Sequence, residues 1–266
     1  MYERIVLPFD GAHRALAPLP YAQQLAHTWQ ARLEILHVAT DIDLPAEAQP
    51  AGHDVRVIQA PDPAQAIGEY MRASDPPGLL CMASRGRSAA GEALFGTVTG
   101  QVIRHLNAPL VVTGPKLRAP THQRDLRRLL VCLDGSATSA SIVPTARTWA
   151  TELGLELVLI HVTYPLGDPS IGEITVPVET RVVADELRRT ADELTQVGLN
   201  VRWHLVEDTQ PASGIIHQAA HRDADLIVMA THGRTGLARI LTGSVTTDVI
   251  RNAPVPILTL RPEHLK

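Results

Sequence analysis

Residues 226–246 read LIVMATHGRTGLARILTGSVT, and this stretch indicates the fold most clearly. Its first five residues are apolar and form a run of the right length for one buried strand. Gly233 and Gly243 then bracket a more polar loop, and the segment from Ser244 onward has the composition of a helix start. A strand, a glycine-containing loop and a helix in this order predict one unit of a parallel α/β sheet.

The same pattern occurs earlier in the chain. Gly86 precedes Gly233 by 147 residues, and the segments around the two glycines match. A second correspondence joins residues 5–11 to residues 129–135, where Asp10 precedes Asp134 by 124 residues. The chain is therefore a duplication. The two offsets differ by 23 residues, which places additional length in the second copy, after Val162 and before Gly233.

We predict two tandem domains, at residues 1–115 and 128–266, joined by a polar linker at 116–127 that contains Pro120. The length of 266 residues is ordinary for two domains. In the first domain the connection from Val38 to Val55 is too short for two loops and a full helix. We therefore expect its second helix to be missing or reduced.

The second copy shows the alternation of strands and helices in full. Apolar runs predict strands at residues 129–133, 155–162, 201–206, 225–230 and 256–260. Helical spacing and start signals predict helices at 136–153, with Ser136 as N-cap, and at 179–197, 212–221 and 244–251. Such alternation implies a doubly wound parallel sheet with helices on both faces.

Composition excludes several classes of protein. The net charge of −4 argues against binding nucleic acid or anionic lipid through bulk electrostatics, and 3% aromatic residues argue against a base-stacking surface. No apolar run approaches the length of a membrane helix, and no signal-peptide core follows Met1. Cys81 and Cys132 lie in strand-like runs and are expected to be buried, reduced thiols. We expect a cytoplasmic protein.

Candidate ligand-binding residues follow the predicted strands, where open parallel sheets bind ligands. Gly233 can bring backbone N–H groups close to a ligand, and Gly243 opens a helix whose free N–H groups favour a phosphate. Ser244 could donate from its hydroxyl, and Arg234 and Arg239 could add charge-assisted bonds. The first copy offers an equivalent set: Arg85, Gly86, Arg87, Gly96 and Thr97. The alternative interpretation is that these glycines only make turns and helix caps, and that Asp10 and Asp134 are turn or cap residues.

No constellation of catalytic or metal-binding side chains is evident. The twelve histidines show no zinc spacing with cysteine or glutamate, so we expect no metal held by protein side chains. His37 and His161 end strands beside the candidate pocket and are expected to be structural, hydrogen-bonded histidines. The nucleophile-elbow sequence G-x-S-x-G is absent. Catalytic residues are therefore not assigned.

The motifs quoted above resemble those of the universal stress protein family. The resemblance rests on Asp134-Gly135-Ser136 after a strand, on Leu-Ile-His-Val ending at Val162, on the run at 226–236 and on Gly-Ser-Val-Thr at 243–246. Both copies carry these features, so nearly the whole chain is similar to a tandem member of the family. The resemblance implies five-stranded parallel sheets of order 3-2-1-4-5, bound ATP with Mg²⁺ on its phosphates, and no established catalytic activity.

The resemblance also implies which residues bind the nucleotide. In the second copy Asp134 and Val162 would hold the adenine, and the remaining candidates are Met229, Ala230, His232, Gly233, Arg234, Gly243, Ser244 and Val245. In the first copy the candidates are Asp10, Val38, Met82, Ala83, Arg85, Gly86, Arg87, Gly96, Thr97 and Val98. The chain departs from the family pattern in that alanine replaces its first glycine in both copies, at Ala83 and Ala230, and Ala12 replaces a serine. We therefore favour the second site.

The leading hypothesis is a nucleotide-binding regulatory protein of the stress response, with at most slow ATP hydrolysis. A second hypothesis is an adenylate-forming enzyme, and a third is a nucleotide-free protein-interaction scaffold. We expect the two domains to pack as a pseudo-dimer through their last strands, near Val111 and Leu258. A true homodimer is compatible with the sequence, whereas protein partners and the preferred nucleotide are not specified by it.

Overall fold

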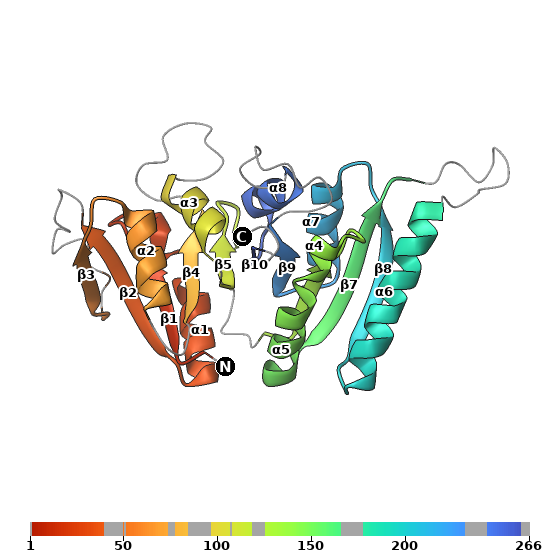
Figure 1. The fold of residues 1–266 in the computed structure, drawn as a ribbon, viewed down its shortest axis with the longest axis horizontal. Coiled ribbons are helices and arrows are strands. Elements are labelled where there is room, and N and C mark those ends of the chain that lie inside the picture. Colours follow the sequence, from red (N-terminus) through yellow and green to blue (C-terminus); the bar gives the residue numbers. More distant parts are fainter. Residues whose placement is uncertain are drawn as a thin grey trace.

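The computed structural model describes residues 2–39, 50, 52–73, 78–84, 97–106, 108–118, 126–165, 178–231 and 244–261. Strands and helices alternate along these residues, and the strands form one twisted sheet at the centre of the molecule (Figure 1). The order of the strands in that sheet is β3-β2-β1-β4-β5-β10-β9-β6-β7-β8.

The first half of the sheet is built from residues 4–113. Its elements are β1 (Arg4–Pro8), the short 3₁₀ helix η1 (His13–Leu16), α1 (Leu19–Trp29), β2 (Arg32–Ala39), β3 (Val55–Gln59), α2 (Pro63–Arg72), β4 (Leu79–Ala83), α3 (Thr97–His105) and β5 (Leu110–Thr113).

The second half repeats this order with an additional helix. Its elements are β6 (Arg128–Cys132), α4 (Ala137–Ala140), α5 (Val143–Leu153), β7 (Glu156–Thr163), α6 (Val178–Gln196), β8 (Val201–Glu207), α7 (Pro211–His221), β9 (Leu226–Ala230), α8 (Ser244–Asn252) and β10 (Ile257–Leu260).

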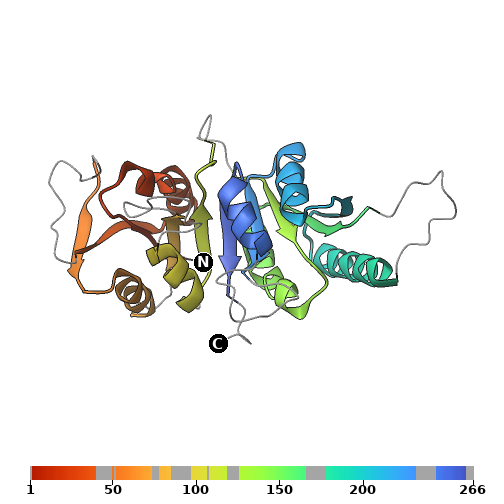
Figure 2. The same ribbon diagram turned by 90° about the horizontal axis from the view of Figure 1, so that it is seen from above.

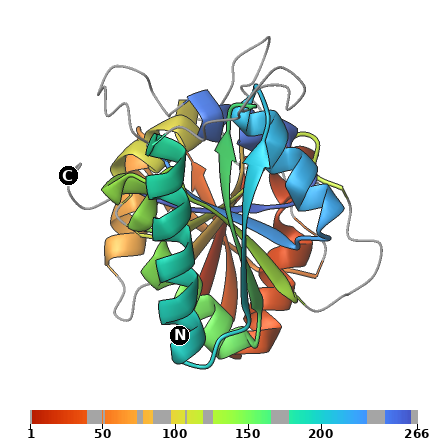
Figure 3. The same cartoon turned by 90° about the vertical axis from the view of Figure 1, so that its right-hand side faces the viewer.

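Each half has the predicted strand order 3-2-1-4-5, and its strands are parallel. The central strands are almost continuously apolar because helices cover both faces of the sheet, as the end-on view shows (Figure 3). Successive residues point to opposite faces. Ile5 and Leu7 join one hydrophobic cluster, Val6 joins the other, and each cluster extends through both halves.

The two halves share one sheet because their last strands pair. β5 and β10 are antiparallel, with Leu258 opposite Val111, and Figure 2 shows them side by side at the centre. The predicted pseudo-dimer and the strands that form it are therefore confirmed. On the face of the sheet that α1 and α5 cover, the rings of Trp29 in α1 and Trp149 in α5 meet edge to face with centroids 4.9 Å apart, which adds a second contact between the halves.

One predicted helix is wrong in its extent. The sequence indicated a single helix over residues 136–153, whereas the structure has α4 and α5 separated at residues 141–142. Pro144 lies in the first turn of α5. Proline has no N–H to donate to residue 140, and its ring clashes with that carbonyl in a continuous helix. Pro20 takes the same place in α1, after η1.

The additional length predicted for the second half contains α6. Its counterpart connection in the first half includes residues 40–49 and 51, which lie outside the described residues, so the expectation of a missing or reduced helix there stays a prediction. Cys81 and Cys132 are free and buried, as expected. Among the described residues, no helix combines the length and apolar character needed to cross a membrane.

Candidate functional site

The carboxyl ends of the central strands bring the sequence candidates together in both halves. In the second half, β6 lies between β7 and β9, so Asp134, Val162 and Ala230 follow or end three neighbouring strands. α8, which begins at Ser244, covers the end of β9. In the first half β1 lies between β2 and β4, which groups Asp10, Val38 and Ala83 in the same way. Figure 1 shows α3 and α8 on the same, upper side of the molecule.

The turn after β6 is fixed by hydrogen bonds around Asp134. Its Oδ1 accepts from the backbone N–H of Ser136 at 3.0 Å and from the Ser136 hydroxyl at 2.6 Å. Ser136 in turn caps α4, because its Oγ accepts from the N–H of Ser139 at 3.0 Å. Gly135 has φ +78°, and a Cβ there would lie 2.7 Å from Cγ2 of Val183 in α6. The turn therefore requires glycine, and the predicted N-cap is confirmed.

The equivalent turn after β1 has alanine in place of the capping serine. Asp10 Oδ1 accepts from the N–H of Ala12 at 3.0 Å, and Gly11 has φ +87°. Ala12 has no side-chain oxygen, so η1 begins without a side-chain cap. The first half forms a 3₁₀ turn where the second half forms α4. With alanine at residue 12, the turn has no serine hydroxyl that could donate to the aspartate and cap the helix.

The histidines that end the second strands have a structural role. His37 Nδ1 lies 2.8 Å from the carbonyl oxygen of Phe9, and His161 Nδ1 lies 2.9 Å from that of Leu133. A carbonyl only accepts, so Nδ1 carries the proton in both rings. These bonds tie β2 to the end of β1 and β7 to the end of β6. The expectation that both histidines are hydrogen-bonded structural residues is confirmed.

Two threonines that the sequence interpretation gave no role connect the helix starts to the strands. Thr246 Oγ1 in the first turn of α8 donates to the carbonyl oxygen of Ala230 at 3.2 Å. Thr99 Oγ1 in α3 donates to that of Ala83 at 3.0 Å. Both threonines are buried. Thr246 follows Thr99 by 147 residues, the offset between the two glycine loops, and this repetition is the feature of the sequence that could have indicated a shared role. Each bond holds the N-terminal turn of a helix against the end of the strand before the glycine loop.

The remaining candidates divide into three groups, according to how much of each residue the structure describes. Met82 and Met229 are buried, and Val38, Val98, Val162 and Val245 are partly buried against the same hydrophobic cluster. The candidates of the glycine loops fall outside the described residues: Arg85, Gly86, Arg87, Gly96, His232, Gly233, Arg234, Arg239 and Gly243. Of Thr97 and Ser244 the structure describes the backbone, as the first residues of α3 and α8.

The described part of this edge offers backbone donors rather than reactive side chains. The first turns of α3 and α8 present N–H groups without partners inside the helix, and the helix dipole favours an anion there. Cys132 ends β6 beside the Asp134 turn, but burial raises the pKa of its thiol, which keeps it neutral and unreactive. The described residues contain no group of three or more metal-ligating side chains. The chemistry available is anion binding.

Comparison with known proteins gives one consistent result. The model of the universal stress protein family matches residues 45–114 and 125–261. A universal stress protein of Mycobacterium tuberculosis is 26% identical over 251 residues, covering 92% of this chain and 82% of the relative. One of Mycolicibacterium smegmatis is 29% identical over 188 residues, covering 69% of this chain and 62% of the relative, so the chain spans less than two thirds of that protein. The crystal structure of a universal stress protein from Archaeoglobus fulgidus has a TM-score of 0.66 at 21% identity, covering 98% of this chain and 99% of that one.

Proposed function

The chain belongs to the universal stress protein family, and from this premise we propose that it binds an adenine nucleotide, ATP with Mg²⁺, at the carboxyl edge of its sheet and acts as a regulatory protein of the stress response in the cytoplasm. The nucleotide-bound form would be the one that partner proteins recognise. The observation that supports this most is the Asp134 turn, which holds a carboxylate beside the strand ends and the start of α8.

In the proposed arrangement the adenine contacts a carboxylate and a strand end, whereas the phosphates contact backbone N–H groups at a helix start. The Asp134 carboxylate and the strand end at Val162 would hold the adenine, because a carboxylate accepts from an exocyclic amino group. Met229 and Ala230 would lie along the nucleoside. Gly233, Gly243, Ser244 and Val245 would surround ribose and phosphates, with His232 and Arg234 beside them. Phosphates are favoured at the start of α8 by its N–H groups and dipole.

We propose the second half as the principal site. Ser136 gives the Asp134 turn a second hydrogen bond and a helix cap, which Ala12 cannot provide to Asp10. A turn that is already fixed by a helix cap loses less conformational freedom when a ligand binds. The first-half residues around Asp10, Gly86, Gly96 and Thr97 form the weaker site.

A protein-interaction scaffold without nucleotide is the second candidate. What favours it is the substitution of the first glycine of the family pattern by Ala83 and Ala230, which end β4 and β9. Neither alanine has the positive φ that would require glycine, so a methyl group at these positions causes no backbone strain. The geometry therefore supports the nucleotide-binding candidate better.

Thermal unfolding of nucleotide-free protein with and without Mg²⁺-ATP tests the proposal. A ligand at about 100 times its Kd stabilises the folded state by about 2.7 kcal/mol. We expect Asp134→Ala to lose most of this ATP-dependent increment and Asp10→Ala to lose little. Asp62→Ala is the control, because Asp62 caps α2 with the same kind of bonds away from the Asp134 turn. Equal increments in wild type and Asp134→Ala would contradict the proposal.

Pyrophosphate release that depends on an added substrate would favour the adenylate-forming alternative.

A further inference from the structure

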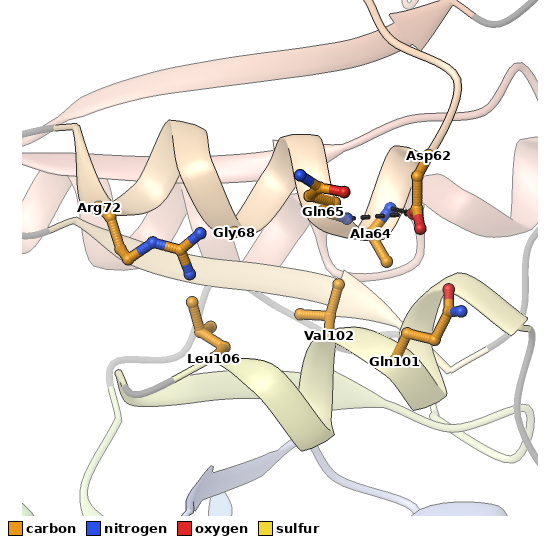
Figure 4. A pocket seen from close by; sticks show the side chains of 8 residues that line it. All are labelled: Asp62, Ala64, Gln65, Gly68, Arg72, Gln101, Val102 and Leu106. Atoms are coloured by element: carbon orange, nitrogen blue, oxygen red, sulfur yellow. Dashed lines mark hydrogen bonds between the residues drawn. The ribbon is translucent and has the colours of Figure 1, made fainter. Parts of the chain in front are cut away.

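A groove runs between α2 and α3 in the first half, apart from the candidates at the strand ends. It encloses about 410 Å³, within the range of small-molecule sites. Figure 4 shows its construction, with Arg72 and Asp62 at opposite ends of α2 and the side chains of α3 facing that helix. The apolar part of its floor consists of Ala64 and Gly68 from α2, Val102 from α3 and Leu106 directly after that helix, and Gln65 and Gln101 add polar lining beside it.

Gly68 opens the middle of this floor. The N-terminal prolines of α2 and α7, Pro63 and Pro211, align the two helices of the duplication. At the position of Gly68, the second half carries Ile216. The groove of the first half thus has space where its counterpart carries a branched side chain. A Cβ on Gly68 would first meet Nη1 of Arg72, at 3.4 Å, so the Arg72 guanidinium lies beside the opening.

The two ends of the groove carry opposite charges, and they differ in whether the charged side chain already has hydrogen-bond partners. Arg72 is exposed, and its side chain makes no ion pair or hydrogen bond with any other residue that the structure describes. Asp62 Oδ1 is occupied by the N–H groups of Ala64 and Gln65, at 2.9 and 3.1 Å. The second half has Ala220 and Gln210 at the corresponding positions. The charged ends are therefore particular to the first half.

We propose that the α2–α3 groove binds a monocarboxylate with an apolar body. Its carboxylate pairs with the Arg72 guanidinium, whose planar fork matches a carboxylate. Its apolar body lies on the floor formed by Gly68, Val102 and Leu106. The ten residue steps from Asp62 to Arg72 span about 15 Å along the helix axis, which suits a medium-length acyl chain. A second carboxylate at the far end would meet Asp62, so dicarboxylates are disfavoured. This inference does not rest on the proposed nucleotide site.

Titration of the full chain with octanoate, followed by amide NMR, tests the proposal. We expect saturable shifts confined to α2 and α3. Octanamide, which has the same chain without the charge, should bind about fivefold more weakly, the size of effect that an exposed ion pair gives. Arg72→Gln should weaken octanoate binding by a similar factor. Arg147→Gln is the control, since Arg147 is an exposed arginine of α5 in the other half.

A second variant separates ligand binding from folding. Gly68→Ile places the second-half side chain in the floor, and because the nearest atom is the end of a flexible arginine, the helix should fold as before. We expect octanoate binding to disappear while circular dichroism and the ATP-dependent stabilisation stay as in wild type. Octanoate binding unchanged in Gly68→Ile, equal binding of octanamide, or shifts only outside α2 and α3 would overturn the proposal.

Discussion

Val111 in β5 lies opposite Leu258 in β10, and both side chains are fully buried. This antiparallel pair joins two parallel half-sheets into one, so the hydrophobic clusters on both faces continue from one half into the other. The chain therefore behaves as one packed unit whose halves stabilise each other.

Gly114→Ala should destabilise the junction strongly. Gly114 follows β5, and a Cβ there would overlap the carbonyl oxygen of Ile250 in α8, which requires the backbone to move. Overpacking of this kind costs about 1–3 kcal/mol. Urea unfolding measures the loss. The control is Gly68→Ala, which meets only a flexible arginine and should be neutral or stabilising by up to about 1 kcal/mol. Equal stabilities for the two variants would contradict the close contact.

Trp149→Ala should remove the second contact between the halves. Trp149 is 1% exposed and packs edge to face against Trp29, with Tyr2 beside both rings. Truncation of a buried tryptophan costs about 3–5 kcal/mol. Trp203→Ala, in edge strand β8, should cost less because that side chain is only partly buried. A smaller loss in Trp149→Ala than in Trp203→Ala, by the same urea unfolding, would show that the aromatic contact between α1 and α5 contributes little.

The stability of the protein should fall as the pH drops below about 6.5, in part through His204. Burial lowers the pKa of His204, and the neighbouring Arg222 and Arg202 lower it further. The unfolded chain then binds a proton more readily than the folded one, so acidification favours unfolding. Replacement by glutamine, which cannot titrate, should reduce the loss of stability between pH 7.5 and 5.5. Urea unfolding at both pH values measures this, and an unchanged difference in His204→Gln would contradict it.

Much of the fold was predictable because the duplication carries the signal twice. The offset between Asp10 and Asp134, together with that between Gly86 and Gly233, predicted both halves and their strand ends, and the position of Ser136 at a helix start predicted its cap. The break before Pro144 was missed because helical spacing continues across it, although the proline itself was visible in the sequence. Packing between distant segments was not predictable. The contact of Gly114 with Ile250 depends on how α8 crosses the end of β5.

For the candidate sites, too, the sequence predicted the position along the strands but not the contacts between distant segments. Apolar strands followed by Asp134 and by a glycine loop predict a candidate site at the carboxyl edge, and the structure brings the strand ends of that site together. The roles of Thr99 and Thr246 required the distances to the carbonyls of Ala83 and Ala230. The α2–α3 groove was not predictable from the sequence, because a glycine inside a helix does not reveal which neighbouring helix it faces.

Calorimetric titration of nucleotide-free protein with Mg²⁺-ATP tests the central claim most directly, with Gly243→Val and Gly96→Val as a matched pair. Valine at either position would place a branched side chain where the phosphates are proposed to approach the backbone. We predict saturable binding in the wild type that Gly243→Val abolishes at the principal site and Gly96→Val leaves largely intact. No binding by the wild type, or binding unchanged in Gly243→Val, would contradict the account and assign the glycine loops a purely structural role.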